Sequence, residues 1–385
     1  MQKSTKIAIC GAGPTGQALA LFLIKKGIPA SHITLIDAKT KEQSQADKRT
    51  IALSCGSQQL LQSIAAAPVK STEIHQIHVS RSGHFGRTLI DRTQQQVPAL
   101  GYVARYADII TPLSDALEQQ GPQLTFLRPA KVINITQTET YAQIQLADQT
   151  SIQAQIVVQA EGGLFNEQNP QTIHRDYQQS AVITSIKASK PIPARAYERF
   201  TDQGPLALLP QEDGYAVVWC VSPDVAEDLV KLDAAAFLAA LQTAFGERLG
   251  RFSHATQRGV FSLGLNAQTD APTGRVICIG NAAQTLHPVA GQGLNLGLRD
   301  AVQLAQILSK SIAPDALQEF FRERIADRNQ TIQLTDRLAQ LFTKPVTHSV
   351  QASAVQTILS AGLGIMDVFP PARNWLAERM MFGKR

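Results

Sequence analysis

The sequence has little of what a disulfide-bonded, disordered or membrane-spanning protein needs. Its 385 residues include only four cysteines, which lie far apart and form no CxxC pair, so we expect reduced thiols in the core. Charged residues make up 17 %, too few for extended disorder. No apolar run approaches the ~18 residues of a bilayer span, and the first predicted strand leaves no room for a signal peptide. We expect a cytoplasmic protein, with peripheral contact to the inner membrane as an alternative.

Signs of a metal site, a catalytic triad or nucleic-acid binding are also weak. No Ser-His-Asp arrangement is recognisable. His75 and His78 fall on a predicted strand an odd number of residues apart, so they would point to opposite faces, and we expect exposed histidines rather than metal ligands. The net charge is +5, but the basic residues are scattered and form no run interleaved with aromatics. This distribution argues against a nucleic-acid partner.

A candidate dinucleotide-binding unit lies at the N-terminus. A short apolar strand, 6–10, leads into the sequence GAGPTG, and apolar residues at helical spacing follow it. A second strand, 33–36, ends at an acid about twenty residues past the glycines, where a ribose hydroxyl is bound in such βαβ units. A lone GxGxxG can be a simple turn, but the strand, the helix and the acid favour a cofactor loop. The candidate cofactor residues here are Gly11, Gly13, Gly16 and Asp37.

A second loop of small residues follows a buried strand near the other end of the chain. The apolar run 276–279 precedes it, and helical spacing of apolar residues begins at Leu294. Backbone N–H groups at the start of a helix are unpaired and partly positive, so such a loop can receive an anion or an electron-rich ring. The candidate cofactor residues in this loop are Gly280, Asn281, Gly291, Gln292, Gly293, Leu294 and Asn295.

Together the two stretches resemble the single-component FAD-dependent aromatic hydroxylases. Within them the chain is most similar to the ubiquinone-biosynthesis branch and its 2-polyprenyl-6-methoxyphenol hydroxylase members. That family normally has GDAAH and then GQGxNxGxxDA in the second loop, whereas this chain has Asn281 for the Asp and Gln284 for the His. Segments 198–201, 204–210 and 335–338 add to the resemblance, which covers nearly the whole chain.

The resemblance implies an α/β fold with three parts. These are a Rossmann-like FAD-binding domain of the p-hydroxybenzoate hydroxylase type, an inserted, mostly antiparallel β-sheet substrate domain, and C-terminal helices. Alternating apolar residues and prolines between 181 and 221 independently predict short strands and turns. The expected FAD-binding domain comprises 1–72, 98–177 and 265–345, the substrate domain 73–97 and 178–264, and the C-terminal helical segment 346–385.

The resemblance also implies the chemistry. NAD(P)H would reduce FAD, and a flavin hydroperoxide would transfer one oxygen atom of O2 to the ring of a 2-polyprenyl-6-methoxyphenol. Arg49 stands where the family has an arginine near the cofactor, and Glu161 replaces an Asp that touches FAD, which leaves that contact open. The candidate catalytic residues are His287, either a general base or part of the loop architecture, Pro288, and Arg199, which could orient the phenol or the nicotinamide.

Several alternatives remain at the level of sequence. The chain could hydroxylate another ubiquinone intermediate or a small aromatic, or it could be a flavin-binding scaffold subunit of a biosynthetic assembly, since function rests on the site and not on the fold. The apolar and basic C-terminal tail could pack on its own domain, lie on a membrane surface or dock on a partner. The expected partners are therefore the polyprenylated phenol, O2, and a membrane surface or a ubiquinone-biosynthesis complex.

Overall fold

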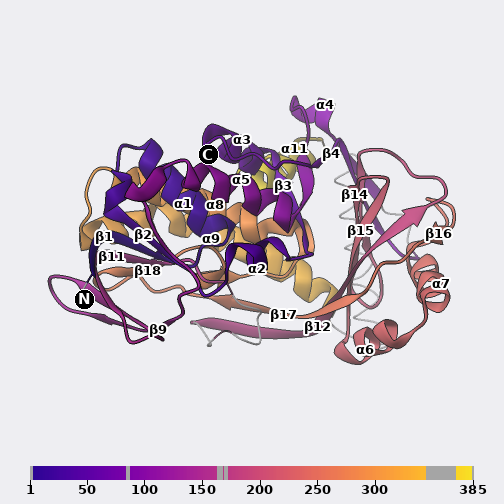
Figure 1. Ribbon diagram of the computed structural model, residues 1–385. Helices are drawn as coiled ribbons and strands as arrows, with labels where there is room; N and C mark the ends of the chain where they lie inside the picture. Colours follow the sequence, from indigo (N-terminus) through magenta and orange to yellow (C-terminus); the bar gives the residue numbers. More distant parts are fainter. Residues whose placement is uncertain (1–2, 84–86, 163–167, 169–171, 344–369, 384–385) are drawn as a thin grey trace.

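The computed structural model describes residues 3–83, 87–162, 168, 172–343 and 370–383. Two large sheets divide these residues into a cofactor-side lobe with helices around a mainly parallel sheet and a second lobe built on a mainly antiparallel sheet (Figure 1). A small third sheet lies between them. The predicted α/β fold with an inserted antiparallel sheet is confirmed, while the exact domain bounds stay a prediction.

The first sheet has seven strands and contains the predicted βαβ unit. Its first strand pairs in parallel with two neighbours, so that Ile7 lies opposite both Ile33 and Ile156. Ile7 and Ile9 are fully buried on one face and Ala8 and Cys10 on the other, as a central parallel strand requires. The strands, in spatial order, are β8 (Thr125–Leu127), β2 (Ile33–Ile36), β1 (Lys3–Cys10), β11 (Ser151–Gln159), β10 (Ala142–Leu146) and β9 (Val132–Gln137), with β18 (Val276–Cys278) beside β11.

Helices cover this sheet, and two of them approach closely. An ideal Cβ built on Gly297 would lie 2.7 Å from Thr15 Oγ1, so the helices that carry these residues can touch only because position 297 has no side chain. The apolar side chains of both helices then join one core with Ile7 and Ile9. The helices of this lobe are α1 (Pro14–Lys25), α2 (Lys41–Gln45), α3 (Cys55–Ser63), α5 (Tyr106–Glu118), α8 (Gln292–Leu308) and α9 (Pro314–Thr343).

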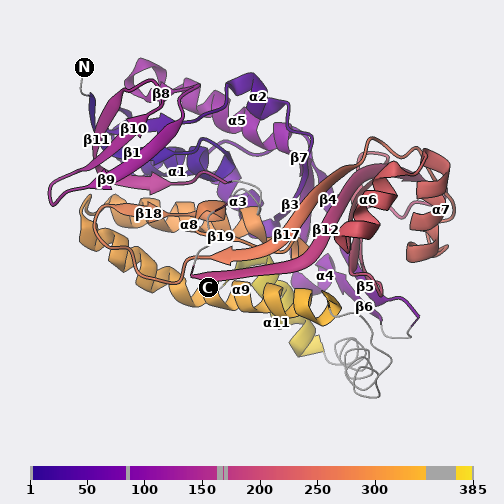
Figure 2. The same ribbon diagram turned by 90° about the horizontal axis from the view of Figure 1, so that it is seen from below.

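In the described part of the chain the second sheet has nine strands, which pair antiparallel except for β13 and β5, which are parallel. Two helices, α6 (Pro223–Lys231) and α7 (Ala234–Phe245), cover one face of it at the far end of the molecule (Figures 1 and 2). The strands, in spatial order, are β19 (Gln284–Thr285), β17 (Gly259–Ala267), β12 (Ile173–Ala188), β15 (Gly214–Val221), β14 (Pro205–Gln211), β13 (Arg195–Phe200), β5 (Gln76–Arg81) and β6 (Arg87–Asp91), with β16 (Phe252–Ser253) beside β12.

The third sheet joins the two lobes. It consists of β3 (Thr50–Ser54), β7 (Gly101–Arg105) and β4 (Thr72–Ile74), and the short helix α4 (Arg92–Gln95) follows β6. The C-terminal helix α11 (Pro370–Phe382) packs against α3, where Ala377 and Met381 contact the same core as Val103. It is the described part of the predicted C-terminal segment, of which residues 346–369 lie outside the described residues. No helix in the described ranges is long and apolar enough to cross a membrane.

His78 corrects one prediction from the sequence. It is buried on β5 and not exposed, because its ring packs at 5.6 Å from the ring of Tyr197 and contacts Arg248 at 2.9 Å. Burial and the Arg248 charge lower the pKa of His78 to about 4. Among the described residues, no group of three or more His, Cys, Asp or Glu side chains is placed to hold a metal ion.

Candidate flavin site

The first glycine loop is shaped by close backbone approach. Gly11 has φ +101°, and an ideal Cβ there would lie 2.5 Å from the backbone N of Glu161 at the end of β11. At Gly16 the added Cβ would lie 1.9 Å from the carbonyl oxygen of Gly11. Larger side chains cannot occupy these two positions without displacing the backbone. The loop therefore lies flat between β1, β11 and the start of α1.

Asp37 is held beside this loop at the carboxyl end of β2. Its Oδ2 accepts a hydrogen bond from the N–H of Ala12 at 2.5 Å, and its Oδ1 accepts one from the N–H of Lys39 at 2.7 Å. Each carboxylate oxygen has a second lone pair, so an oriented Asp37 can still accept from a ribose hydroxyl. The N-terminus of α1 at Gly13 has no capping side chain, which leaves its N–H groups available to a pyrophosphate.

The second glycine loop meets the first at Thr15. An ideal Cβ on Gly280, which has φ +58°, would lie 3.1 Å from Thr15 Oγ1. Next to it, the exposed side chain of Asn281 lies between two other glycines. An ideal Cβ built on Gly162 would lie 3.0 Å from the Asn281 Cβ, and one built on Gly293 would lie 3.7 Å from the Asn281 Oδ1. Two segments from opposite ends of the chain thus form one glycine-lined cradle with a single amide in it.

The helix α8 starts at this cradle without a capping side chain. Its N-cap, Gly291, is left-handed with φ +59°, and the structure gives it no side-chain cap. Asn295, one turn on, is buried and donates to the carbonyl oxygens of Ala52 at 3.1 Å and Gly291 at 2.6 Å, while it accepts from the N–H of Ser54 at 2.8 Å. Asn295 therefore holds β3 against the first turn of α8.

The remaining loop residues differ in what they offer to a cofactor. The side chain of Gln292 is buried and donates to the carbonyl oxygen of Met380 at 3.3 Å. Gly293 and Leu294 have no side-chain donors, so they can contribute only the backbone N–H groups of the helix start. The cradle therefore presents neutral dipoles rather than full charges to whatever binds there.

Arg49 and Glu161 lie on either side of the first loop. The guanidinium of Arg49 forms a two-pronged ion pair with Asp47, with Nη2 and Oδ2 2.7 Å apart, and lies 5.1 Å from the ring centre of Tyr106. This fixes its direction. Glu161 follows β11, and desolvation of its carboxyl group together with the nearby Asp37 carboxylate raises its pKa.

His287 is buried and neutral. Its Nδ1 accepts from the N–H of Val289 at 3.1 Å, so its Nε2 must carry the proton, and it lies 3.1 Å from Gln179 Oε1. Tyr177 packs edge-on against the ring at 5.3 Å, and burial lowers the pKa of His287 to about 3. Both ring nitrogens are engaged, so the geometry favours the architectural role: His287 anchors the loop to Gln179 on β12, and the carbonyl oxygen of the adjacent Pro288 accepts from the N–H of Gly291 at 2.9 Å.

Gln284, the second departure from the family motif, belongs to a buried network and not to the cradle. It donates to Asp300 Oδ2 at 3.0 Å and accepts from Arg328 Nε at 2.9 Å. Asp300 also accepts from the backbone N–H of Gly280, at 3.4 Å. Because an amide can donate and accept at once, Gln284 links the second loop to α8 and α9.

Arg199 lies away from the two glycine loops. It lies on β13 two residues after Tyr197, so both side chains point to the same face of the sheet, the face covered by α7. Its Nε donates to the carbonyl oxygen of Ala244 on α7 at 3.1 Å, and its Nη2 lies 3.5 Å from Ser82 Oγ. The structure does not bring Arg199 together with the other predicted site residues.

Glu198, the neighbour of Arg199, points to the opposite face. Residues that pair across neighbouring strands point to the same face. Glu198 pairs with Ala207 on β14, Ala207 with Val218 on β15, and Val218 with Ile183 on β12. Ile183 shares its face with Gln179, the residue that contacts His287 of the flavin loop. Glu198 is therefore on the side of the sheet that faces the cradle.

The carboxyl group of Glu198 is enclosed and incompletely paired. Its Oε1 has no hydrogen-bond partner among the described residues, and burial raises the pKa of Glu198 to about 7. Reasoning from the sequence did not single out Glu198 as a functional residue. The signal was one acid at an inward position of an apolar, alternating strand, Ala196-Tyr-Glu198-Arg-Phe200.

Fold and site together define a dinucleotide-binding flavoprotein of the p-hydroxybenzoate hydroxylase type. The loops fit FAD, because the glycines at 11, 162 and 280 let three segments pack closely around two helix starts without capping side chains, where backbone N–H groups can receive a dinucleotide. The chain belongs to the family described as FAD binding domain, whose model matches residues 4–335.

Named relatives place the chain among flavin hydroxylases. It is 28 % identical to a ubiquinone hydroxylase, UbiL, of Rhodospirillum rubrum, over 98 % of this chain and 90 % of that one. It is 30 % identical to the 3-demethoxyubiquinol 3-hydroxylase of Escherichia coli over 79 % of each chain. The p-nitrophenol 4-monooxygenase PnpA of Pseudomonas putida has the same fold, with a TM-score of 0.74, 16 % identity and full coverage of both chains. The predicted resemblance is confirmed: the protein is an FAD-dependent monooxygenase, with NAD(P)H as the usual reductant of its class.

Proposed function

We propose that the protein hydroxylates the aromatic ring of a 2-polyprenyl-6-methoxyphenol in ubiquinone biosynthesis. The observation that carries this is the sheet face that is turned toward the glycine cradle. On this face Glu198 is an enclosed acid among Ala196, Ala207 and Val218. An apolar ring with one hydroxyl matches an apolar wall with one proton acceptor. The names of the hydroxylase relatives support the same pathway.

Bound FAD would supply the redox chemistry, which is acceptance of a hydride from NAD(P)H and activation of O2. The protein's own residues bind and orient it. The loop Gly11–Gly16 and the start of α1 receive the pyrophosphate, and Asp37 accepts from the ribose. The backbone N–H groups of Gly293 and Leu294 would stabilise negative charge at the edge of the flavin ring. Asn281 would donate to, or accept from, the chain between ring and phosphate.

Glu198 handles the proton of the substrate. With a pKa of about 7, its carboxylate can accept the phenol proton near neutral pH and return it after the ring has been hydroxylated. A phenolate is more electron-rich than a phenol, so this step prepares the ring to receive an oxygen atom. Neither His287 nor Arg199 is needed for this step, since each is engaged elsewhere in the protein.

Substrate selectivity tests the proposal. FAD-loaded protein is mixed with NAD(P)H and either a short-chain 2-prenyl-6-methoxyphenol or 4-hydroxybenzoate, and NAD(P)H consumption is followed. We expect the methoxyphenol to stimulate consumption and the soluble acid to have little effect. Stimulation by the soluble acid alone would favour a small-aromatic hydroxylase. No stimulation by either compound, with FAD bound, would favour a flavin-binding scaffold subunit.

The helix α11 supports a further proposal on where the apolar substrate is collected. Trp375 is 61 % exposed on this helix, and the Arg379 guanidinium lies 5.8 Å from its ring centre. An exposed Trp beside a cation is suited to the interface of an anionic membrane. We expect co-sedimentation with phosphatidylglycerol vesicles that weakens in Trp375→Ala. Equal binding by both proteins would contradict a role for this helix.

A further inference from the structure

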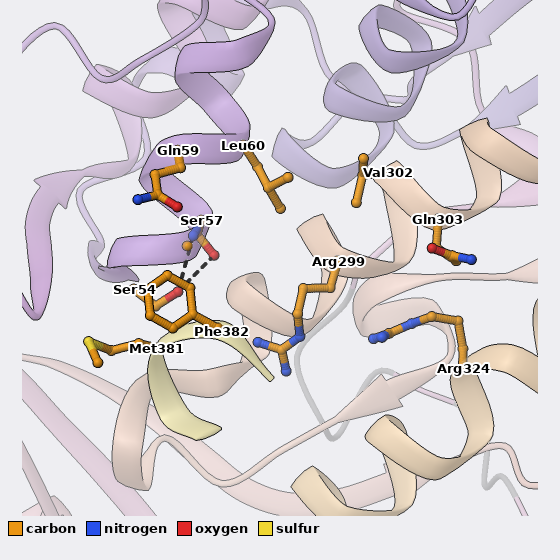
Figure 3. A pocket seen from close by; sticks show the side chains of 11 residues that line it. Ser54, Ser57, Gln59, Leu60, Arg299, Val302, Gln303, Arg324, Met381 and Phe382 are labelled. Atoms are coloured by element: carbon orange, nitrogen blue, oxygen red, sulfur yellow. Dashed lines mark hydrogen bonds between the residues drawn. The ribbon is translucent and has the colours of Figure 1, made fainter. Parts of the chain in front are cut away.

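A cavity of about 330 Å³ lies beside α8 (Figure 3), lined by Arg299, Val302 and Gln303 and not by the cradle residues Gly293 and Gly297 of the same helix. Its wall is formed by the start of α3, by α8 and α9, and by the end of α11. Arg299 and Arg324 line it, and Figure 3 shows the Arg324 side chain extending toward Arg299, whose guanidinium lies on the side of Met381 and Phe382. Leu60, Val302 and Phe382 make the rest of the wall partly apolar. None of these residues takes part in the proposed hydroxylation.

The two arginines use only part of their hydrogen-bonding capacity. Arg299 Nε donates to Asp327 Oδ2 at 3.1 Å, and Arg324 donates through Nε to Asp300 Oδ1 at 2.9 Å and through Nη1 to Asp327 Oδ2 at 2.7 Å. Both side chains are about nine-tenths buried, Arg324 with 9 % and Arg299 with 11 % of the side chain exposed. Arg299 Nη1 and Nη2 and Arg324 Nη2 have no partner in the part of the chain that the structure describes. Enclosed charged donors without partners are costly.

The charges around the cavity do not balance. Arg328 belongs to the same network, but it donates to neutral groups, the Gln284 side chain at 2.9 Å and the Gln268 carbonyl oxygen at 3.0 Å. Among the enclosed side chains that the structure describes, three guanidinium groups, at 299, 324 and 328, therefore share one network with two carboxylates, at 300 and 327, which leaves one positive charge in excess; the Glu323 carboxylate, which accepts from Gln303, is exposed. Arginine does not lose its proton in proteins, so this excess cannot be removed by titration.

The start of α3 adds to the positive potential. This nine-residue helix begins at the cavity, with Ser54 as its N-cap accepting from the N–H of Ser57 at 3.2 Å. Helix N-termini carry partial positive charge, and the hydroxyls of Ser54 and Ser57 line the same cavity. Two independent features, unpartnered buried guanidinium groups and a helix start, thus favour the same kind of ligand.

We propose that this cavity binds an oxyanion of the size of a phosphate group. Its oxygens would accept from the free Nη groups of Arg299 and Arg324, which would complete the hydrogen bonding of both and cancel the excess charge. The partly apolar wall also admits a phosphate that carries an apolar substituent. The phosphate group could come from free phosphate or from a lipid headgroup, and both sources share the recognition described here.

The test is binding of inorganic phosphate to the FAD-loaded full-length protein by calorimetry, with the unfolding temperature followed in parallel. We expect saturable binding and a rise in unfolding temperature that chloride at equal ionic strength does not produce. Arg299→Gln should bind phosphate at least about tenfold more weakly, because it removes two charge-assisted donors. Unchanged phosphate binding in Arg299→Gln would overturn the assignment.

A second pair of variants keeps the test valid should Arg299→Gln fold poorly. Val302→Glu places a carboxylate in the cavity wall, and Val302→Gln is its neutral match. The Glu variant should unfold at a higher temperature than the Gln variant without phosphate and should lose the response to phosphate. Equal unfolding temperatures and equal responses in the two variants would contradict an anion site.

The two sources are separated by vesicles. The protein is sedimented with phosphatidic acid vesicles and with phosphatidylcholine vesicles, and wild type is compared with Arg299→Gln. Loss of phosphatidic acid binding in the variant supports a lipid headgroup, whereas binding of inorganic phosphate alone supports a free anion. If wild type binds neither inorganic phosphate nor phosphatidic acid, the proposal is wrong.

Discussion

The two faces of the nine-stranded sheet are made by the same strands but differ in content. On the face toward α6 and α7, large rings pack together, with Trp219 6.4 Å from Phe237 and Tyr197 5.4 Å from Phe245 between ring centres. On the face toward the glycine cradle, Ala207 and Val218 stand in a row with Glu198. The period of two along a strand separates packing from chemistry. Large rings secure the fold on one side, while aliphatic side chains surround a single acid on the other.

The largest expected effect breaks the packing face. Phe237 is fully buried on α7, and Phe237→Ala should lower the free energy of unfolding by about 3–5 kcal/mol because it leaves a cavity. Urea unfolding measures this. Leu238→Ala on the same helix, where the side chain is only half-buried, is the control and should cost less. At low temperature the folded fraction of Phe237→Ala should keep its FAD and its rate of hydroxylation. If folded Phe237→Ala hydroxylated the substrate as much more slowly as its stability is lowered, the two faces would not have separate roles.

The next effect concerns the cradle face alone. Glu198→Gln should lower the rate of hydroxylation by about 100-fold, since a general base typically contributes that much or more, while FAD remains bound. Product formation under single-turnover conditions measures it. Glu212→Gln, on an exposed turn where Glu212 pairs with Arg105, is the matched control and should behave as wild type. Wild-type rates in Glu198→Gln would remove the proposed role.

The pKa of Glu198 also predicts how stability depends on pH. Its ordinary value is 4.5, and burial raises it to about 7 in the folded state. Between these values the unfolded chain is ionised at this residue while the folded protein remains protonated, so stability falls as pH rises. Wild type should lose about 3 kcal/mol from this residue between pH 4.5 and the region above pH 7. In urea unfolding, Glu198→Gln should lack that loss; equal pH slopes would show that Glu198 is not the titrating group.

The smallest effect separates His287 from Glu198. His287→Gln retains a donor toward Gln179 but loses the acceptor for the N–H of Val289, which should cost about 1 kcal/mol of stability. With a pKa of about 3, His287 stays neutral at working pH, so the pH–rate profile should not shift in this variant. A profile that becomes flat in His287→Gln but not in Glu198→Gln would reverse the two roles.

Local motifs were predictable from the sequence because their residues act close together in the chain. The strand, the loop Gly11–Gly16 and Asp37 form one βαβ unit, and α8 follows its loop directly. The cradle itself needs the contact of Gly280 with Thr15, which joins distant segments, but both segments carry their own signals.

The rest of the site depends on which face of a strand meets which neighbour. Alternation shows that Glu198 and Arg199 point to opposite faces, but not which of them faces the flavin. That is decided by the row from β13 to β12 and by the contact of Gln179 with His287. The burial of His287 is equally nonlocal, since Tyr177 and Gln179 come from a distant strand. For this reason the sequence favoured Arg199 and left the role of His287 open.

The most direct test of the account is the fate of O2. FAD-loaded protein is supplied with NAD(P)H, a short-chain 2-prenyl-6-methoxyphenol and isotopically labelled O2, and the products are analysed by mass spectrometry. The account predicts a ring-hydroxylated product that carries one labelled oxygen atom, formed rapidly by wild type and slowly by Glu198→Gln. NAD(P)H consumption that yields only labelled hydrogen peroxide and returns the phenol unchanged would contradict it.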